Sequence, residues 1–356
     1  MDRLYTLHSR ALAAVHADLE NHALAQGEAP LATPGGVVKR RNAGGFSYYA
    51  LQQYDFEKRR RETYLAGPEG DPDAERKAGA ALDRIRDSQE AIQSLRLLSR
   101  EGYGLMSPRA YAVVASLSNQ GLFAGGGLLV GTHAFETIVN KLGIRAASFV
   151  TEDVDIGRAS KIALPNVPEG GMLDMLRASG VDFGTVPPLV HRDPSIKFKE
   201  IGRSRFTVGI IVPSPNTGYG TAYVPELKCH AVALPYFRYL VSESQPATVL
   251  SRLGCAAVRV PLPERFALHK LLVSQLRPGR SEKGAKDRRQ AAILLAALGE
   301  LEPGALESAA ARIPISVRSK VAAAWNSTRE TLANHPAGVE QMERALARAG
   351  SRGAAG

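Results

Sequence analysis

The clearest chemical pattern in the sequence is a pair of aspartates, Asp153 and Asp155, in the segment Thr151 to Ile156. Residues two apart on a β-strand project from the same face, so a strand here would place the two carboxylates side by side. Neighbouring carboxylates repel each other unless a divalent cation neutralises them. Because Mg²⁺ binds one or two carboxylates together with water and substrate phosphates, we expect Mg²⁺ or Mn²⁺ at this pair.

A glycine-rich turn upstream of the pair is a candidate for phosphate binding. Three glycines, 125 to 127, lead into the apolar run Leu128 to Val130, and Gly131 and Thr132 then begin a predicted helix. A helix start with a small residue and a hydroxyl presents N–H and O–H groups to an anion. The spacing excludes a P-loop, which needs a Lys-Ser/Thr pair, and a dinucleotide fingerprint, whose third glycine would stand at Val130. The alternative is a plain turn before a buried strand.

The remaining candidate residues have ordinary structural alternatives. Lys270 lies on a predicted helix with an apolar face, where a snorkelling surface lysine is the alternative to a ligand. His133 and His269 belong to no HExxH or Ser/His/Asp arrangement, so we interpret them as packed or surface histidines. Cys229 and Cys255 form no CxxC motif, which supports neither a disulfide scaffold nor a zinc site.

Taken together, Gly131-Thr132 and Asp153-Val154-Asp155 resemble the hallmark of the nucleotidyltransferase superfamily of the DNA polymerase β fold. That hallmark is Gly-Gly or Gly-Ser at a helix start, followed by an acidic pair on the next strand. The wider pattern resembles a bacterial family of nucleotidyltransferase-fold proteins. Its C-terminal part, where Lys270-Leu271 is followed by Lys286-Asp287, resembles abortive-infection-type toxin nucleotidyltransferases. The matching segments are Gly45 to Tyr49, Tyr64 to Pro68, Val130 to Phe135, Thr151 to Ile156, Val260 to Leu271 and Lys283 to Ala291.

This resemblance implies an α+β fold, with a polymerase-β-like mixed sheet and helices. It also implies metal-dependent transfer of a nucleoside monophosphate from an NTP to an acceptor, which could be RNA, another nucleic acid or a protein. The residues it implicates have three roles: metal binding by Asp153 and Asp155, phosphate binding by Gly131, Thr132 and Lys270, and flanking of the nucleotide site by Lys286 and Asp287.

One position departs from the family pattern. Superfamily members carry a third acid on a later strand, and in the segment Phe206 to Pro213 the expected position is held by Gly209. Without that acid a two-metal site becomes a one-metal site at best, although Glu226 is an alternative third acid. A degenerate protein that binds nucleotide, RNA or a protein partner without catalysis is therefore the alternative function.

Length and composition indicate how many domains the chain forms and what its surface is like. The 356 residues are 44 % apolar and 22 % charged with a net charge of +10, which predicts two or three domains with a real core. The basic residues are spread over 39–41, 58–61, 192–205 and 277–289, and we interpret them mainly as solvated faces. A third hypothesis is RNA binding by aromatic residues between Phe46 and Tyr64 beside Arg59 to Arg61. With no bilayer-spanning apolar run and no signal-peptide h-region, we expect a cytoplasmic protein without membrane contact.

The elements that must position the site fall into three predicted domains. Residues 1–106 hold N-terminal helices over 1–30 and 73–101 and, after a Pro-Gly-rich break at 30–45, a small hairpin of 45–51 with 62–67. Residues 107–260 form the nucleotidyltransferase-like domain, and residues 261–356 a helical C-terminal domain. The other expected segments are helices over 107–120, 133–142, 170–179, 264–276 and 285–298, strands over 128–130, 147–156, 195–200 and 205–212, a polar loop over 277–284, further helices to 348 and a frayed end over 349–356.

Three placements follow from these assignments. The strand Thr151 to Ile156 should lie next to Leu128 to Val130, with both aspartates near the N–H groups of Gly131 and Thr132. Lys270 should reach the same cleft from the C-terminal helices. Gly209 should lie on the strand beside the aspartate pair.

Overall fold

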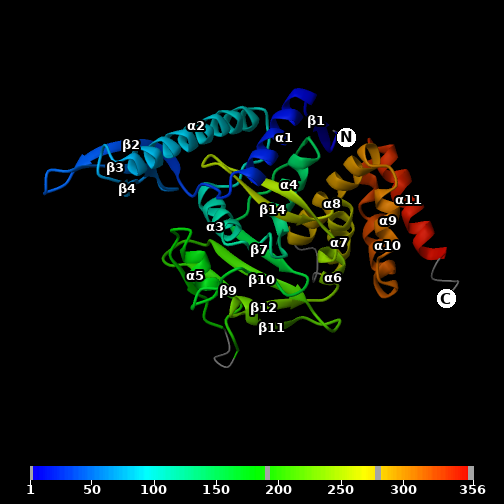
Figure 1. The fold of residues 1–356 in the computed structure, drawn as a ribbon. Helices are drawn as coiled ribbons and strands as arrows, with labels where there is room; N and C mark the ends of the chain where they lie inside the picture. The colour runs from blue at the N-terminus through cyan, green and yellow to red at the C-terminus, as the bar shows by residue number, and fades with distance from the viewer. Residues whose placement is uncertain (1–2, 189–192, 277–281, 352–356) are drawn as a thin grey trace.

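The computed structural model describes residues 3–188, 193–276 and 282–351, and it forms a mixed α+β fold around one central sheet (Figure 1). This confirms the predicted fold class. In the described residues the sheet has seven strands, with β11, β12, β10, β7 and β5 in spatial order and with β9 on β10 and β8 on β9. β7, β10 and β12 run parallel, while β5, β9 and β11 are antiparallel to their neighbours. The strands are β5 (Gly127–Val130), β7 (Asp153–Arg158), β8 (Phe183–Thr185), β9 (Lys197–Glu200), β10 (Thr207–Pro213), β11 (Gly220–Val224) and β12 (Cys229–Leu234).

Alternation along β7 and β10 decides which side chains face the core. Val154 and Ile156 on β7, and Val208 and Ile210 on β10, are fully buried. The residues between them belong to the other face, because successive strand residues point to opposite sides. Asp153 and Asp155 therefore lie on the opposite face from the core, as the sequence predicts.

Helices between the strands pack on the sheet. α3 (Pro108–Asn119) begins at Ser107, whose hydroxyl accepts the Ala110 N–H at 3.3 Å, with Pro108 in the first turn as predicted. α4 (Gly131–Lys141) follows β5 directly and packs against β5 and β7. The other helices of this region are α5 (Met172–Arg177), the 3₁₀ helix η1 (Pro225–Leu227) and α6 (Phe237–Val241).

A two-stranded ribbon joins the sheet region to the C-terminal helices. It consists of β13 (Ser244–Leu250) and β14 (Cys255–Pro261), which the sequence analysis does not predict as a hairpin. β14 packs against β5 and α1 and leads into α7 (Pro263–Leu276). Of the predicted loop 277–284 and the predicted frayed end 349–356, residues 277–281 and 352–356 lie outside the described residues, while 282–284 and 349–351 belong to helices, so the predicted bounds were wrong there. The helical region that follows contains α8 (Glu282–Leu301), α9 (Ala305–Ala310), η2 (Ile315–Val317), α10 (Arg318–Asn326), η3 (Arg329–Leu332) and α11 (Pro336–Ser351).

The N-terminal region differs from the predicted helix over 1–30. β1 (Tyr5–Leu7) pairs with β6 (Ile144–Ala146), and α1 (Arg10–Ala25) begins only after Ser9, whose hydroxyl accepts the Leu12 N–H. A side-chain cap at Ser9 ends the extended segment and starts the helix. The helical spacing of the apolar residues concealed this boundary.

The predicted hairpin is a three-stranded antiparallel sheet, so that prediction was wrong in strand number. It contains β2 (Thr33–Arg41), β3 (Ser47–Tyr54) and β4 (Arg60–Ala66). β2 lies inside the stretch interpreted as a Pro-Gly break, and its pairing shifts register between Pro34 and Gly36. Such an irregularity accommodates Pro and Gly in a strand.

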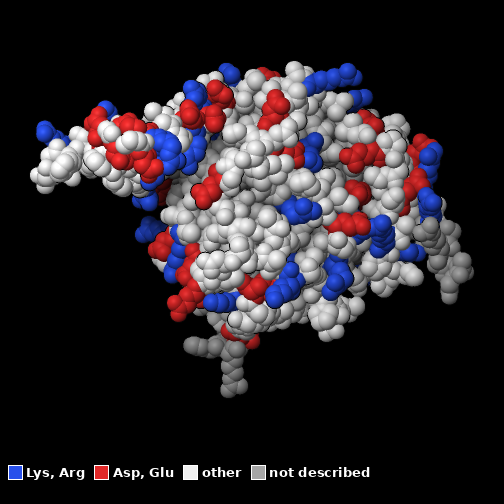
Figure 2. All heavy atoms as spheres, in the orientation of Figure 1, with Lys and Arg blue, Asp and Glu red and all other residues white. Residues whose placement is uncertain are grey.

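These strands and the N-terminal part of α2 (Pro72–Arg100) project from the rest of the molecule as an arm (Figure 1), while Leu95 and Leu98 near the end of α2 pack on the body of the molecule. Several basic side chains of the arm are paired locally: Arg40 with Glu62, and Arg59 and Arg61 with Asp55. Figure 2 shows acidic and basic side chains intermixed on the arm. RNA binding by this arm stays a prediction.

Within the described ranges, no helix is long and apolar enough to cross a membrane.

Candidate active site

The turn from β5 into α4 brings Gly131 against Asp155. Gly131 adopts φ +71°, a left-handed conformation, as the first residue of α4. A Cβ at this position would lie 2.6 Å from Asp155 Oδ2, which is closer than real Cβ contacts. Only glycine meets both requirements without strain. The helix start and the acidic strand are therefore in direct contact.

The two aspartates differ in their surroundings. Asp153 is exposed, and Thr207 Oγ1 donates a hydrogen bond of 2.5 Å to Asp153 Oδ1. Asp155 is half-buried and pairs in register with Val130 on β5 and Gly209 on β10. Burial, and to a lesser extent the charge of Asp153, raises the pKa of the Asp155 carboxyl. A bound cation would reverse both effects.

Lysines on β9, which are not among the predicted site residues, extend this row of side chains. Lys197 pairs with Gly209, and Lys199 pairs with Thr207. Both lysines are exposed, and the intervening Phe198 is buried on the core side. Lys197 lies near enough to Asp155 to oppose the rise in its pKa. The alternation Lys-Phe-Lys was the available signal, but only strand pairing places it beside the aspartates.

Gly209 occupies the position on β10 where the resemblance predicts a third acidic side chain. A Cβ added there would have one neighbour within 4 Å, Asp155 Oδ1 at 3.4 Å, so the backbone leaves space for a side chain. Glu226, the alternative third acid, does not fill it. Its carboxylate binds Arg158 at 2.6 Å and accepts the Ile162 N–H at 2.9 Å, which holds it by the far end of β7.

The C-terminal helices bring cations to the aspartates, with Lys270 bound to Asp287. Lys270 Nζ lies 2.7 Å from Asp287 Oδ1 and 5.3 Å from the centre of the Phe266 ring. Its side chain is 13 % exposed, so it is no freely solvated surface lysine. Lys270 also opposes the rise in the pKa of Asp155. The structure thus pairs Lys270 with Asp287 and brings Lys270 near enough to Asp155 to affect its charge.

Lys286, also predicted at the site, approaches from α8. Its Nζ lies 3.5 Å from the carbonyl oxygen of Val150 and 5.8 Å from the centre of the Phe149 ring. Burial and the nearby charge of Lys270 lower the pKa of Lys286. Lys286 therefore contacts the segment that leads into the aspartate strand.

The carboxylates of Asp153 and Asp155 suit a hard cation that binds few protein ligands. No group of three or more His, Cys, Asp or Glu side chains that could hold a metal exists among the described residues. Two carboxylates on one face are nevertheless sufficient for Mg²⁺, which keeps several waters and substrate oxygens as ligands. Asp153 and Asp155 fit this role.

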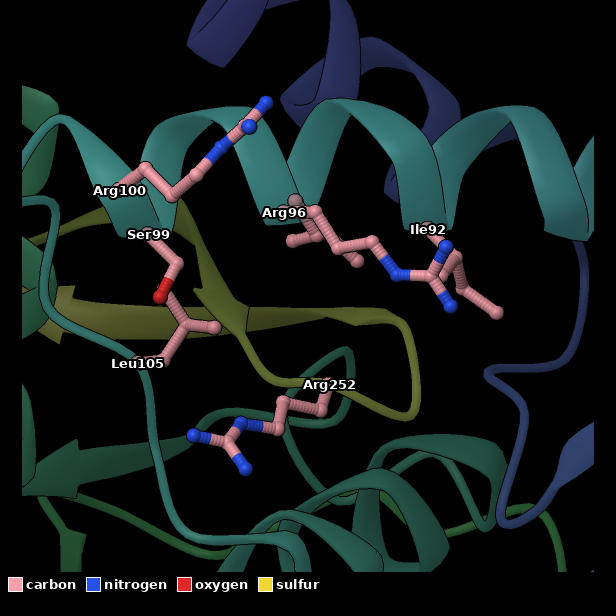
Figure 3. A pocket seen from close by; sticks show the side chains of 7 residues that line it. Ile92, Arg96, Ser99, Arg100, Leu105 and Arg252 are labelled. Carbon is pink, nitrogen blue, oxygen red and sulfur yellow. The ribbon is translucent and has the colours of Figure 1, made fainter.

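A separate pocket lined by three arginines contains none of the predicted site residues. It lies between α2 and the turn from β13 to β14, has a volume of about 490 Å³ and has Arg96, Arg100 and Arg252 around it. In Figure 3 the three guanidinium groups point in different directions. They do not converge on one point, so this pocket is not a compact anion site.

Comparison with known proteins identifies the family. A family model described as a nucleotidyltransferase matches residues 109–314, which excludes the two resembling segments between Gly45 and Pro68. No curated protein and no solved structure matches the chain. The matched range includes the aspartate pair, the Gly131 turn and Lys270 with Asp287. Because this range is more than half of the chain, the protein belongs to the nucleotidyltransferase family.

Proposed function

We propose that the chain is a metal-dependent nucleotidyltransferase that moves a nucleoside monophosphate from an NTP to an acceptor. The observation that carries the proposal is the contact between Asp155 Oδ2 and the Gly131 backbone. It brings the Asp155 carboxylate to the start of a helix, whose first N–H groups have no partner within the helix, and Asp153 lies on the same face of the same strand. The order of β5, Gly131-Thr132, α4 and β7 supports a polymerase-β-like site, and the sequence resemblance supports a bacterial family.

The proposed reaction forms one bond and breaks one bond at the α-phosphorus. An acceptor oxygen attacks the α-phosphorus, the bond from that phosphorus to the bridging oxygen breaks, and pyrophosphate leaves with its electron pair. The acceptor proton passes to water. Phosphoryl transfer depends mostly on positioning and on stabilisation of charge, so the groups around the phosphates determine its rate.

Each predicted residue then has a physical role. Asp153 and Asp155 hold Mg²⁺ or Mn²⁺, which when bound neutralises phosphate charge and assists the attacking and leaving oxygens. The N–H groups at Gly131 and Thr132 donate to phosphate oxygens. Lys270 on α7 and Lys197 on β9 add positive charge near Asp155, and Asp287 holds Lys270 in place.

Gly209 favours a second function, binding without transfer. A carboxylate at this position would stand beside Asp155, and its absence leaves the attacking oxygen without a nearby acidic group. The acceptor would then be a partner, RNA or protein, that binds but is not modified. This alternative shares the nucleotide-binding groups and differs only in turnover.

Release of pyrophosphate distinguishes the two functions. The full chain is incubated with Mg²⁺ or Mn²⁺ and each NTP, with and without total RNA or protein extract, and pyrophosphate is measured. Metal-dependent release that Asp155→Asn abolishes supports the transferase. The matched control is Asp18→Asn, an exposed aspartate on α1, which should leave release unchanged. NTP binding without release supports the alternative.

A further inference from the structure

A cavity of about 490 Å³ lies beside α4. We name it the α4 pocket. Its walls are α4 and the segments 102–107 and 145–151. The lining residues used below are Tyr103, Met106, His133, Glu136, Phe149 and Thr151.

His133 is the most unusual side chain in this pocket. It is 5 % exposed, and neither ring nitrogen has a hydrogen-bond partner among the described residues. Burial lowers the pKa of His133 to about 4, so the ring is neutral at physiological pH and carries one donor and one acceptor. Buried polar groups are normally hydrogen-bonded, so a ring lining a cavity without partners points to a missing ligand.

Glu136 lies one helical turn further along the same face of α4. It is half-buried, and it accepts the backbone N–H of Phe149. Burial raises its pKa to about 7. His133 and Glu136 therefore lie side by side on the face of α4 that lines the cavity, because residues three apart on a helix are adjacent. Both ring nitrogens of His133 are buried, so a ligand reaches them only if the ring turns.

The rest of the lining is suited to a flat, partly apolar ring. Tyr103 and Met106 are buried, and the Phe149 ring packs on Phe135 with centroids 5.4 Å apart. Aromatic and apolar walls with a few polar groups are typical of sites for small organic rings. A nucleobase has this character, with two apolar faces and a polar edge.

The α4 pocket is adjacent to the groups that would bind the phosphates. His133 follows Thr132 at the start of α4, and Thr151 of the pocket wall precedes Asp153 by two residues. Lys286 reaches the carbonyl of Val150 on the pocket wall. Phosphates at Gly131 and Thr132 would thus place the attached nucleoside within reach of the pocket.

We infer that the α4 pocket receives the base of the NTP, with His133 and Glu136 hydrogen-bonded to the edge of the base. This inference rests on the proposed function and adds base selection to it. A site that uses buried polar groups discriminates strongly against ligands that leave them unpaired. The four NTPs should therefore bind with different affinities.

Equilibrium binding to the full chain tests this inference with uncleavable probes. The probes are the four α,β-methylene NTPs and the matching ribose triphosphate, which has no base. We expect at least one NTP to bind roughly tenfold more tightly than the ribose triphosphate, since one well-made polar contact is worth about that factor. Glu136→Gln, which keeps the shape, and His133→Gln should each reduce this difference by several-fold. Neither should change the affinity for ribose triphosphate.

The control is Glu90→Gln, an exposed glutamate on α2, which should leave all affinities unchanged. If His133→Gln does not fold, Glu136→Gln alone decides. Equal affinity of all NTPs and ribose triphosphate in the unmodified chain would overturn the base pocket but leave the proposed function intact. If Glu136→Gln and His133→Gln raise only the KM of the acceptor, the pocket is an acceptor site and the inference that it binds the base is wrong. Failure of every triphosphate to bind would overturn both proposals.

Discussion

Replacement of Gly131 by alanine tests whether the turn into α4 fixes the position of Asp155. Alanine at φ +71° costs about 1–2 kcal/mol, because the left-handed region is strained for residues with a Cβ. The added Cβ would also meet Asp155 Oδ2 at 2.6 Å, so the carboxylate must retreat by about 0.8 Å to reach an ordinary contact of 3.4 Å. A ligand displaced by that much should weaken Mn²⁺ binding by tenfold or more.

Gly126 offers a matched control in the same turn region. It adopts φ +109°, and a Cβ there would have no neighbour within 4 Å. Gly126→Ala should therefore lower stability through backbone strain alone and leave Mn²⁺ affinity unchanged. The difference between the two variants isolates the contact with Asp155.

Two measurements suffice for this comparison. Urea unfolding gives the free energy of unfolding of each variant, and titration of free Mn²⁺ by electron paramagnetic resonance gives its affinity. We expect both variants to lose stability and only Gly131→Ala to lose affinity. Equal Mn²⁺ affinity in Gly131→Ala and the unmodified chain would refute the reasoning.

Four further outcomes are expected. Gly209→Asp should tighten Mn²⁺ binding roughly tenfold, because it adds a carboxylate whose Cβ lies 3.4 Å from the nearest neighbouring atom; unchanged affinity would contradict an open third position. Lys197→Met should also tighten Mn²⁺ binding, because it removes a nearby cation, and it should weaken the binding of tripolyphosphate. Weaker Mn²⁺ binding or tighter tripolyphosphate binding would contradict the placement of Lys197 beside Asp155. The contribution of His133 to stability, measured as the difference in urea unfolding between the unmodified chain and His133→Gln, should fall by about 2.5 kcal/mol as the pH drops from 6.5 to 4, because unfolded His133 binds a proton near its usual pKa while the folded ring, with a pKa of about 4, is only half protonated at the end of this range. The total stability should change less, because Glu136, whose pKa is raised to about 7, is protonated mainly in the folded state over the same range and contributes in the opposite direction. Lys270→Met should destabilise the fold by about 3 kcal/mol, because it removes an ammonium group from the buried carboxylate of Asp287. The same substitution should lower the affinity for triphosphate, and an unchanged affinity would contradict the role of Lys270 at the phosphates.

Local signals in the sequence were sufficient for the elements of the site. Ser107 and Pro108 mark a helix start, and the alternation in Asp153-Val154-Asp155 marks a strand with one buried face. The structure places Gly131 beside Asp155 and Gly209 in register with it, as expected from the sequence. The helix start and the alternation depend on neighbours a few residues apart, which a single sequence contains, whereas the placement of Gly131 and Gly209 beside Asp155 was expected from the resemblance to the nucleotidyltransferase family.

Long-range pairings that the family resemblance does not supply were not predictable. The sequence does not specify that β9 joins β10, which alone brings Lys197 beside Asp155. β2 was hidden because Pro34 and its neighbouring glycines are unfavourable in strands, and the pairing tolerates them through a register shift. The unpartnered ring of His133 is likewise visible only once α4 is packed.

Transfer of label from α-³²P NTP to an acceptor tests the central claim most directly, namely that Asp153 and Asp155 support metal-dependent nucleotidyl transfer. The full chain, Asp153→Asn and Asp155→Asn are incubated with each labelled NTP, Mg²⁺ or Mn²⁺, and total RNA or protein. We predict that the unmodified chain transfers label from at least one NTP, that chelation of the metal stops it, and that each substitution reduces it at least a hundredfold. NTP binding without transfer, or transfer that persists in both variants, would contradict the account.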